Sequence, residues 1–192
     1  MKRLLIILLL CSFAGNVFCQ SKMPAISIIH LTGNFYTYIS YGTYEGEPTP
    51  ANAMYLVTKK GVILFDTPWE ENYYQPLLDS IWERHHKKVL MCISTHFHKD
   101  RTGGLQYYAG KGIKTYTTRR TDSLSVIHHM PRAQYLIPDD TTFNIDGNIF
   151  QTYYPGAGHT TDNIVIWFPK EKILYGGCFI KSTEDNNLGF TG

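Results

Sequence analysis

The sequence predicts an α/β domain in which two β-sheets pack face to face and helices cover their outer sides. The first supporting observation is that the two halves of the chain resemble each other. Each runs from strands to a helix, then to a further strand and a loop with polar, ligand-type side chains. The second is composition. With 192 residues, 43% apolar and 18% charged, the chain is typical of one globular domain with an ordinary core.

The N-terminus predicts a secretory signal peptide rather than part of this domain. Lys2 and Arg3 make a basic start, residues 4–10 form an unbroken apolar run, and a plausible cleavage point precedes Gln20. The apolar run is too short to span a bilayer. We therefore expect residues 1–19 to be removed on export, and residues 20–192 to form one domain in the periplasm.

Removal of this segment changes the charge balance and the cysteine count. Loss of Lys2 and Arg3 lowers the 18 basic residues to 16, which equals the 16 acidic residues. A balanced chain gives no reason to expect nucleic acid or a membrane as partner, and a monomer is the default. Of four cysteines, Cys92 and Cys178 remain. In an exported protein these two could form a disulfide, or at least one could bind a metal.

The predicted strands are short runs rich in β-branched and aromatic residues, bounded by turn-forming residues. They are 26–31, 35–41, 54–58, 62–65, 89–93, 115–118, 149–154, 164–168 and 173–175. The strand at 89–93 has no polar alternation, which predicts burial on both faces. Residues 41–50 are rich in Gly, Thr and Pro, so we expect a mobile loop there.

Helices are predicted between these strands. After Trp69, apolar side chains recur at the i, i+3, i+4, i+7 and i+8 spacing of an amphipathic helix. They are Tyr74, Leu77, Leu78, Ile81 and Trp82. Shorter helices are predicted at 105–109 and 120–128, the second ending before Pro131.

Residues with metal-binding chemistry directly follow the buried strand at 89–93. His96, His98 and Asp100 lie in the stretch STHFHKDRTGG. Imidazoles at i and i+2 of an extended chain point the same way, and a carboxylate two residues on can join them or reach a neighbouring ion. Neutral imidazole and carboxylate are good zinc ligands. Gly103 and Gly104 allow the backbone to approach this site closely.

Two further candidate ligands lie at the ends of later strands. His159 follows a glycine-rich loop at 155–158, and Cys178 follows a Tyr-Gly-Gly sequence. Each pattern also has a purely structural interpretation, because a His-x-His pair can arise by chance and a cysteine after a strand is usually a small buried hydrophobe. Cys92 is predicted to be such a core residue. The remaining histidines are predicted to lie on the surface: His30, His85, His86, His128 and His129.

Three separated motifs, THFHKDRTGGL, GAGHTTDNIVIWFP and GGCFIKS, together resemble the subclass B1 metallo-β-lactamases. The resemblance extends over the mature chain, including ANAMYLVTKKGVILFDTPW and MPRAQYLI, and flavobacterial-type enzymes look most similar. It implies the αβ/βα four-layer sandwich of that family. It also implies zinc-dependent hydrolysis of the β-lactam amide bond of penicillins, cephalosporins and carbapenems by a metal-activated hydroxide, and hence antibiotic resistance.

The resemblance implies a set of metal ligands. His96, His98 and His159 would bind the first of two zinc ions. Asp100 and Cys178 would bind the second, and Asp100 would also orient the attacking nucleophile.

Further roles are implied outside the ligand set. Lys181 would pair with the carboxylate of the substrate, and Asp66 would support the metal site from behind. Residues 41–50 would form a flap over the substrate, in which Tyr44 could contact it.

The chain departs from the family pattern at two points. The family has an oxyanion asparagine after a Leu-Gly pair, whereas here Phe190 takes that position and Asn186 or Asn187 could substitute. The family also continues with a strand, a helix and a Gly-His turn that supplies the sixth metal ligand, and no histidine follows His159 here. We therefore expect the domain to lack its last strand and helix, as in a C-terminally truncated sequence.

Two other functions stay open. One is another hydrolase of the same superfamily, such as a thioester hydrolase. Those proteins typically have histidine directly after the aspartate, where this chain has Arg101, and they lack the cysteine ligand. The other is a secreted zinc-binding module without catalytic activity, which would have kept the first site.

Overall fold

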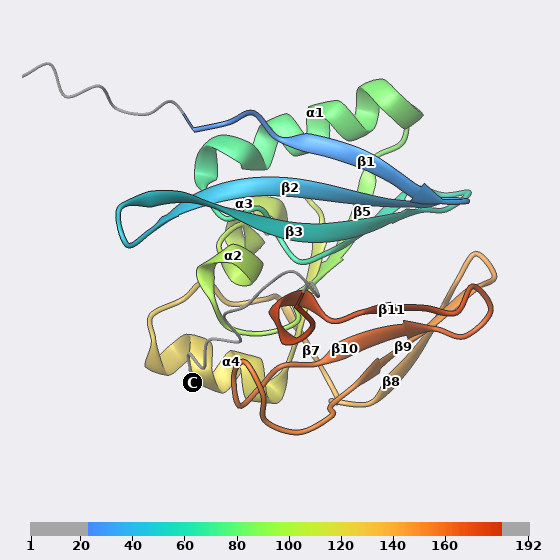
Figure 1. The fold of residues 1–192 in the computed structure, drawn as a ribbon. Coiled ribbons are helices and arrows are strands. Elements are labelled where there is room, and N and C mark those ends of the chain that lie inside the picture. The colour runs from blue at the N-terminus through green and yellow to red at the C-terminus, as the bar shows by residue number, and fades with distance from the viewer. Residues whose placement is uncertain (1–22, 182–192) are drawn as a thin grey trace, which may run out of the picture.

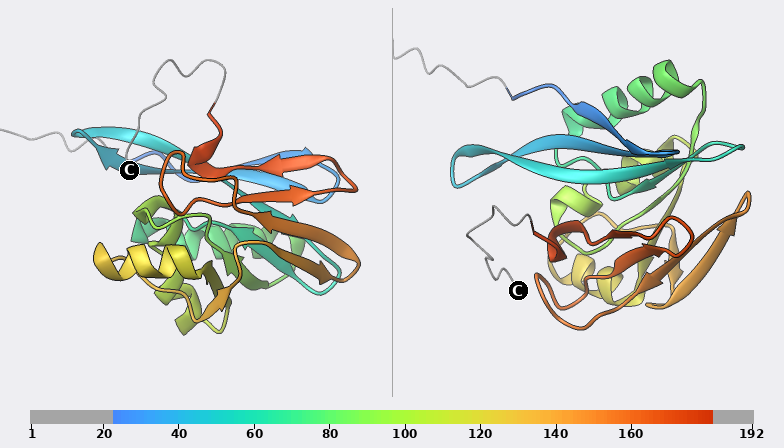
Figure 2. Two further views of the ribbon diagram at one scale, coloured as in Figure 1. Left: turned by 90° about the horizontal axis from the view of Figure 1, so that it is seen from below. Right: turned by 45° about the vertical axis from the view of Figure 1, so that its right-hand side comes forward.

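Two β-sheets pack face to face in this protein, whose structure is a computed structural model that describes residues 23–181. Figure 1 shows the seven-stranded sheet above and the four-stranded sheet below it. The views in Figure 2 show the same stacking. The predicted signal peptide and the residues that depart from the family pattern, Asn186, Asn187 and Phe190, lie outside the described residues.

The first sheet has its strands in sequence order. They are β1 (Ser27–Thr32), β2 (Phe35–Tyr44), β3 (Glu47–Val57), β4 (Val62–Phe65), β5 (Val89–Ile93), β6 (Lys114–Thr118) and β7 (Tyr135–Ile137). Pairs from β1 to β4 are antiparallel, whereas β4 to β7 are parallel. Parallel neighbouring strands need crossover connections, so a loop follows the carboxyl end of β5, on the side of the sheet where the parallel strands end. Such edges are where ligands collect in α/β folds.

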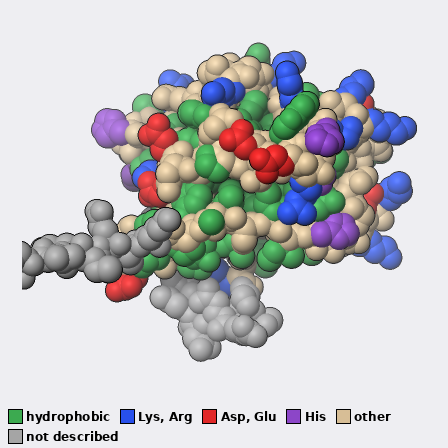
Figure 3. All heavy atoms as spheres, turned by 90° about the horizontal axis from the view of Figure 1, so that it is seen from above, with side chains coloured by type: hydrophobic (Ala, Val, Ile, Leu, Met, Phe, Trp, Pro, Cys, Tyr) green, Lys and Arg blue, Asp and Glu red, His purple; other side chains and the backbone are tan. Residues whose placement is uncertain are grey.

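Helices α1 (Tyr74–His85) and α3 (Leu105–Gly110) pack on one face of this sheet. The apolar stripe predicted for α1 supplies Leu77 and Ile81, which are fully buried, but Trp82 is 49% exposed, so the stripe is narrower than predicted. The predicted strand at 89–93 is buried except at Leu90. Figure 3 views the molecule from the α1 side, where basic and acidic side chains share one face.

The second sheet is antiparallel and covers the other face of the first. Its strands, in spatial order, are β11 (Ile173–Tyr175), β10 (Val165–Phe168), β9 (Asn148–Tyr153) and β8 (Thr141–Ile145). Aromatic rings fill the space between the sheets. The ring of Phe65 on β4 lies 5.4 Å from the rings of Phe150 and Phe168, with near-perpendicular planes. Edge-to-face packing of this kind stabilises a core beyond its buried area.

Helices α1 and α3, the first sheet and the second sheet thus form three layers. A further helix, α4 (Arg119–Ile127), contacts β6 and β7 and lies away from α1 (Figure 1). The outer face of the second sheet carries a groove of about 710 Å³, with Trp167, Leu174 and Ile180 in its wall. No α-helix of residues 23–181 contributes to that wall. None of the helices described is long and apolar enough to cross a membrane.

The segment at 41–50 differs from its prediction. Instead of an irregular loop, β2 and β3 continue as a ladder, with Tyr41 opposite Pro50 and Tyr44 opposite Glu47. Only from Met54 onward does β3 also pair with β4. Its first residues therefore lie at a sheet edge, where proline is tolerated because its missing N–H faces no partner strand.

Other local predictions also need correction. Strands β7 and β8 and the short helix α2 (Lys99–Thr102) were not predicted, and all three are five residues or shorter. His85 is not a plain surface histidine, because its Nε2 lies 3.0 Å from the hydroxyl of the buried Tyr55. Both Cys92 and Cys178 are free thiols, so the disulfide alternative is wrong, whereas burial of Cys92 in the core is confirmed.

Candidate metal centre

The loop after β5 carries the first candidate ligands. His96 is fully buried, and His98 is the N-cap residue of α2 with extended backbone. Asp100 already lies in the first turn of α2. Of the two alternatives left open for Asp100, the structure agrees with the second, because the chain turns after His98 and places Asp100 beside Cys178.

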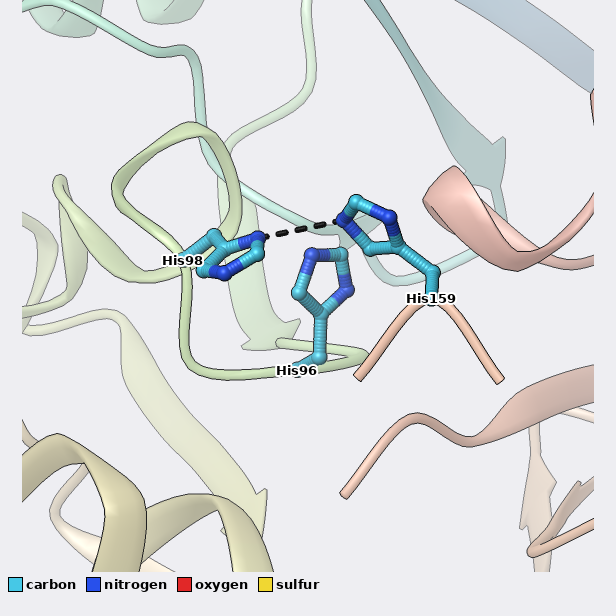
Figure 4. Close-up of side chains that lie close together, drawn as sticks. All are labelled: His96, His98 and His159. Carbon is cyan, nitrogen blue, oxygen red and sulfur yellow. Dashed lines mark hydrogen bonds between the residues drawn. The ribbon is translucent and has the colours of Figure 1, made fainter. Parts of the chain in front are cut away.

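Three imidazoles from two distant segments converge in front of this loop. Figure 4 shows His96 and His98 on the β5 loop facing His159 on the loop between β9 and β10. Nδ1 of His98 lies 3.1 Å from Nε2 of His159, and one ring nitrogen of each histidine lies within 4.8 Å of the others. Two nitrogens bound tetrahedrally to one zinc ion at about 2.05 Å would be about 3.3 Å apart. The spacing therefore matches that of metal ligands.

The protonation of His96 supports the same interpretation. Its Nδ1 lies 3.3 Å from the hydroxyl of Thr95, and that hydroxyl donates to Asp66 at 2.9 Å. Because the Thr95 hydroxyl donates its only proton to Asp66, its oxygen can only accept a hydrogen bond from His96. Nδ1 of His96 is therefore the protonated nitrogen. Nε2 is then left with a lone pair, and it is buried without a hydrogen-bond partner. A buried acceptor of this kind is expected where a metal ion binds.

A second group of ligand atoms adjoins the imidazoles. Sγ of Cys178 lies 3.4 Å from Oδ2 of Asp100, and both atoms lie within 4.8 Å of a nitrogen of His96. Burial raises the pKa of Cys178 to about 11, with Arg101 lowering it and Asp100 raising it. The thiol is therefore protonated in the metal-free chain, and a bound cation would deprotonate it. Imidazole, carboxylate and thiolate form a donor set that suits zinc.

A glycine lets the two ligand-bearing loops of the second sheet touch. Cys178 lies in the short 3₁₀ turn η2 (Gly177–Phe179) after β11. A Cβ at Gly158 would overlap the ring of Phe179, which follows Cys178. Gly158 therefore allows His159 and Cys178 to approach the same site, which explains the glycine loop noted in the sequence.

Burial keeps the three imidazoles neutral, the form that binds a metal ion. It lowers the pKa of His96 well below its usual value, and Arg101 and the other two imidazoles lower it further. Burial also lowers the pKa of His98, although Asp100 and Asp162 oppose this. The pKa of His159 falls to about 4 through burial and the nearby His98 and Lys181.

We expect the lowered pKa of His159 to appear as pH-dependent stability in the metal-free chain. The folded state favours neutral His159, so its contribution is fully present above pH 6.5 and is lost as pH falls from 6.5 through about 4. Urea unfolding of the metal-free chain between pH 7.5 and 4 should therefore show a steeper acid loss than in His159→Gln.

Comparison with this variant isolates the histidine, because the buried Asp66, whose pKa is raised, shifts stability in the opposite direction in both chains. The matched control is His30→Gln, since His30 is exposed on β1. Parallel curves for wild type and His159→Gln would contradict the prediction.

Asp66 lies directly behind the imidazoles, where the resemblance implied it. Its carboxylate is fully buried and accepts hydrogen bonds from the backbone N–H and the hydroxyl of Thr95, at 2.6 and 2.9 Å. Burial raises the pKa of Asp66 to about 6, and Arg101 and Tyr175 oppose the rise. Asp66 is therefore connected to His96 through the hydroxyl of Thr95.

Arg101 is a site residue that the sequence did not reveal as one. Its side chain is 3% exposed, and its Nη2 donates to Sγ of Cys178 at 2.8 Å. Its Nε lies 3.0 Å from Oδ2 of Asp100, and its Nη1 lies 3.4 Å from Oδ2 of Asp66. Its place directly after Asp100 was a sequence signal, but its other partners, Asp66 and Cys178, lie far from it in the chain.

Lys181 and Tyr44 lie outside the ligand clusters. Lys181 is exposed and close enough to lower the pKa of both His96 and His159 through its positive charge. Tyr44 is 53% exposed at the end of β2, at the tip of the hairpin. The roles of both residues towards a substrate stay predictions.

Convergent imidazoles beside a carboxylate and a thiol, at the edge where two packed sheets meet, define a metal-binding α/β sandwich. The family model described as "Metallo-beta-lactamase superfamily" matches residues 46–191. The chain belongs to this family of hydrolases, which confirms the resemblance seen in the sequence.

Individual relatives agree with this assignment. The chain is 48% identical over 177 residues to "Metallo-beta-lactamase type 2" of Elizabethkingia meningoseptica, covering 92% of this chain and 71% of that protein. It is 42% identical to "Metallo-beta-lactamase IND-1" of Chryseobacterium indologenes, covering 83% of this chain and 67% of that protein. The crystal structure of metallo-beta-lactamase IND-7 superposes with a TM-score of 0.83 at 40% identity, covering 88% and 78% of the two chains.

Proposed function

We propose that this chain is an exported zinc enzyme that hydrolyses the β-lactam amide bond of penicillins, cephalosporins and carbapenems, and so confers resistance in the periplasm. The observation that carries the proposal is the convergence of His96, His98 and His159 beside the Asp100–Cys178 pair. The names of the relatives support the substrate class. We propose two zinc ions, one at each cluster, and a monomeric protein.

The residues present fit such a centre. When bound, zinc ions would lower the pKa of a water molecule, so that hydroxide is available at neutral pH to attack an amide carbonyl. His96, His98 and His159 would hold the first ion with neutral imidazoles. Asp100 and Cys178 would hold the second, and the carboxylate of Asp100 would accept a hydrogen bond from the nucleophile and orient it.

Residues around the ligands would bind the substrate and keep the ligands in place. Lys181 follows the Cys178 turn with an exposed ammonium group, which would pair with the carboxylate of the substrate. Asp66 and Thr95 would fix the orientation of His96, so that its Nε2 faces the ion. The hairpin of β2 and β3 would cover the bound substrate, with Tyr44 at its tip.

The test is turnover of a chromogenic cephalosporin by the exported chain with and without a chelator. We expect hydrolysis that stops when the chelator removes zinc and returns when zinc is added back. A thioester substrate run in parallel tests the alternative activity within the family. Turnover that persists in the chelator would refute the metal mechanism, and zinc binding without any turnover would favour a non-catalytic module.

A further inference from the structure

Tyr175 is a partly buried residue between the two sheets that the proposed mechanism leaves without a role. It is the last residue of β11, three residues before Cys178. Its ring centroid lies 6.3 Å from that of Phe65 in the core between the sheets. Its hydroxyl donates to Oδ2 of Asp66 at 2.6 Å and accepts from Nη1 of Arg101 at 3.3 Å. One phenol thus bonds the second sheet to two charged groups carried by the first.

The first of these groups leads to the imidazoles. Oδ2 of Asp66 receives both the Tyr175 hydroxyl and the Thr95 hydroxyl, and Thr95 in turn contacts Nδ1 of His96. Asp66 also accepts from the backbone N–H of Thr95, so two hydrogen bonds from Thr95 hold it on the imidazole side without the Tyr175 hydroxyl.

The second group leads to the carboxylate and the thiol. Arg101 contacts Asp100 through Nε and Cys178 through Nη2, so one guanidinium lies against both ligands of the second cluster. Its Nη1 also donates to the carbonyl oxygen of Asn52 at 2.6 Å. The contact from Nη1 to Tyr175 helps to fix the plane of the guanidinium, and with it the directions of Nε and Nη2.

We propose that Tyr175 is a positioning residue that holds Asp100 and Cys178 at the separation needed to bind the second cation, acting through the guanidinium of Arg101. The proposal rests on the two-ion site proposed above. Tyr175 lies on the same short segment as Cys178, whereas Asp100 and Arg101 lie on α2 of the first half of the chain. The hydroxyl of Tyr175 therefore determines the position of the segment that carries Cys178 relative to α2. It would do so without contacting either of the two proposed metal ions.

The test is titration of the metal-free chain with Co²⁺, in wild type and in Tyr175→Phe. Thiolate-to-metal charge-transfer absorption reports cobalt bound at the site of Asp100 and Cys178. Ligand-field absorption reports cobalt both at this site and at the three histidines. Tyr175→Phe keeps the ring and its contact with Phe65 but removes the hydroxyl. We expect the cobalt affinity measured by charge transfer to fall by about 10-fold or more, which is the range for loss of a partner that orients a metal ligand. The cobalt affinity of the three histidines should stay within about threefold of the wild-type value.

The matched control is Tyr73→Phe, because the hydroxyl of Tyr73 also donates over 2.6 Å but to the carbonyl oxygen of Pro24, away from the clusters. A double-mutant cycle with Arg101→Lys tests the route, since residues acting through one another give non-additive changes in affinity. Additive effects would overturn the role of Arg101 as intermediary.

The remaining outcomes also decide the matter. Equal weakening of both cobalt sites, unchanged affinity, or loss of folding in Tyr175→Phe would each overturn the assignment, because a positioning role predicts a folded chain with one weakened site. Failure of the wild-type chain to bind two ions would instead overturn the proposed function. The two failures are therefore distinguishable.

Discussion

Exchange of His96 for alanine is expected to abolish zinc-dependent hydrolysis while leaving the metal-free fold almost as stable as before. His96 is fully buried, and its Nε2 has no hydrogen-bond partner in the metal-free chain. Leaving such a group unpaired is unfavourable by about 1–3 kcal/mol, which offsets the packing lost in the alanine variant. We expect kcat/KM to fall by more than about 100-fold, the upper range for loss of an outer partner of a metal ligand.

A metal ligand can be told from an ordinary core histidine by measuring stability with and without zinc. At a zinc concentration about 1,000 times its Kd, binding should stabilise the wild-type fold by about 4 kcal/mol, and His96→Ala should lose most of this gain. The control is His30→Ala on the exposed face of β1, which should keep both activity and the zinc effect. If His96→Ala unfolded readily in the metal-free state yet retained its response to zinc, His96 would be a structural residue.

The second large effect is expected for Arg101→Leu, which removes the cation between the carboxylates of Asp66 and Asp100. The side chain of Asp66 is 0% exposed and that of Arg101 is 3% exposed, so the carboxylate would stay buried without its counter-charge. Breaking a buried pair in this way destabilises a fold by about 3–5 kcal/mol. Urea unfolding of the metal-free chain at pH 7 measures this loss as a change in the free energy of unfolding.

The pH dependence of that loss identifies Asp66 as its source. Burial raises the pKa of Asp66 to about 6 even with Arg101 present, and without Arg101 the pKa rises further. Asp66 is then neutral at pH 5, so the destabilisation by Arg101→Leu should be smaller at pH 5 than at pH 7. Arg132→Leu is the control, because Arg132 pairs with Asp122 from an exposed side chain and should change stability by no more than about 1 kcal/mol. Equal losses for the two variants would contradict a buried-charge effect.

Local sequence patterns were sufficient where local physics decides the structure. Apolar spacing predicted α1, and the unbroken apolar run predicted β5, because both patterns reflect burial along a single element. The hairpin of β2 and β3 was not predictable in this way. Residues 41–50 have a loop-like composition, and their strands exist because two segments pair in register, with Gly42 opposite Thr49.

The same difference between local patterns and long-range contacts applies to the candidate site. Spacing alone left a structural interpretation open for each candidate ligand, and the resemblance of three motifs to a known family identified the set of five that the structure brings together. The residues that contact these ligands from behind could not be predicted. Arg101, Thr95 and Tyr175 are ordinary residues in the sequence, and their contacts with Asp66 exist only once segments more than 25 residues apart are folded together.

The rings of Phe65, Phe150 and Phe168 between the sheets have an evolutionary consequence. Candidate ligands on the β5 loop belong to one sheet, and His159 and Cys178 belong to the other, so the thickness of this aromatic spacer determines how far apart the two sets stand. We expect a mutation that replaces one of these rings with a smaller side chain to change the affinity for a metal ion while every candidate ligand stays the same. Natural variation in the interior is thus a route by which a lineage can retune its metal requirement while its coordinating residues stay the same.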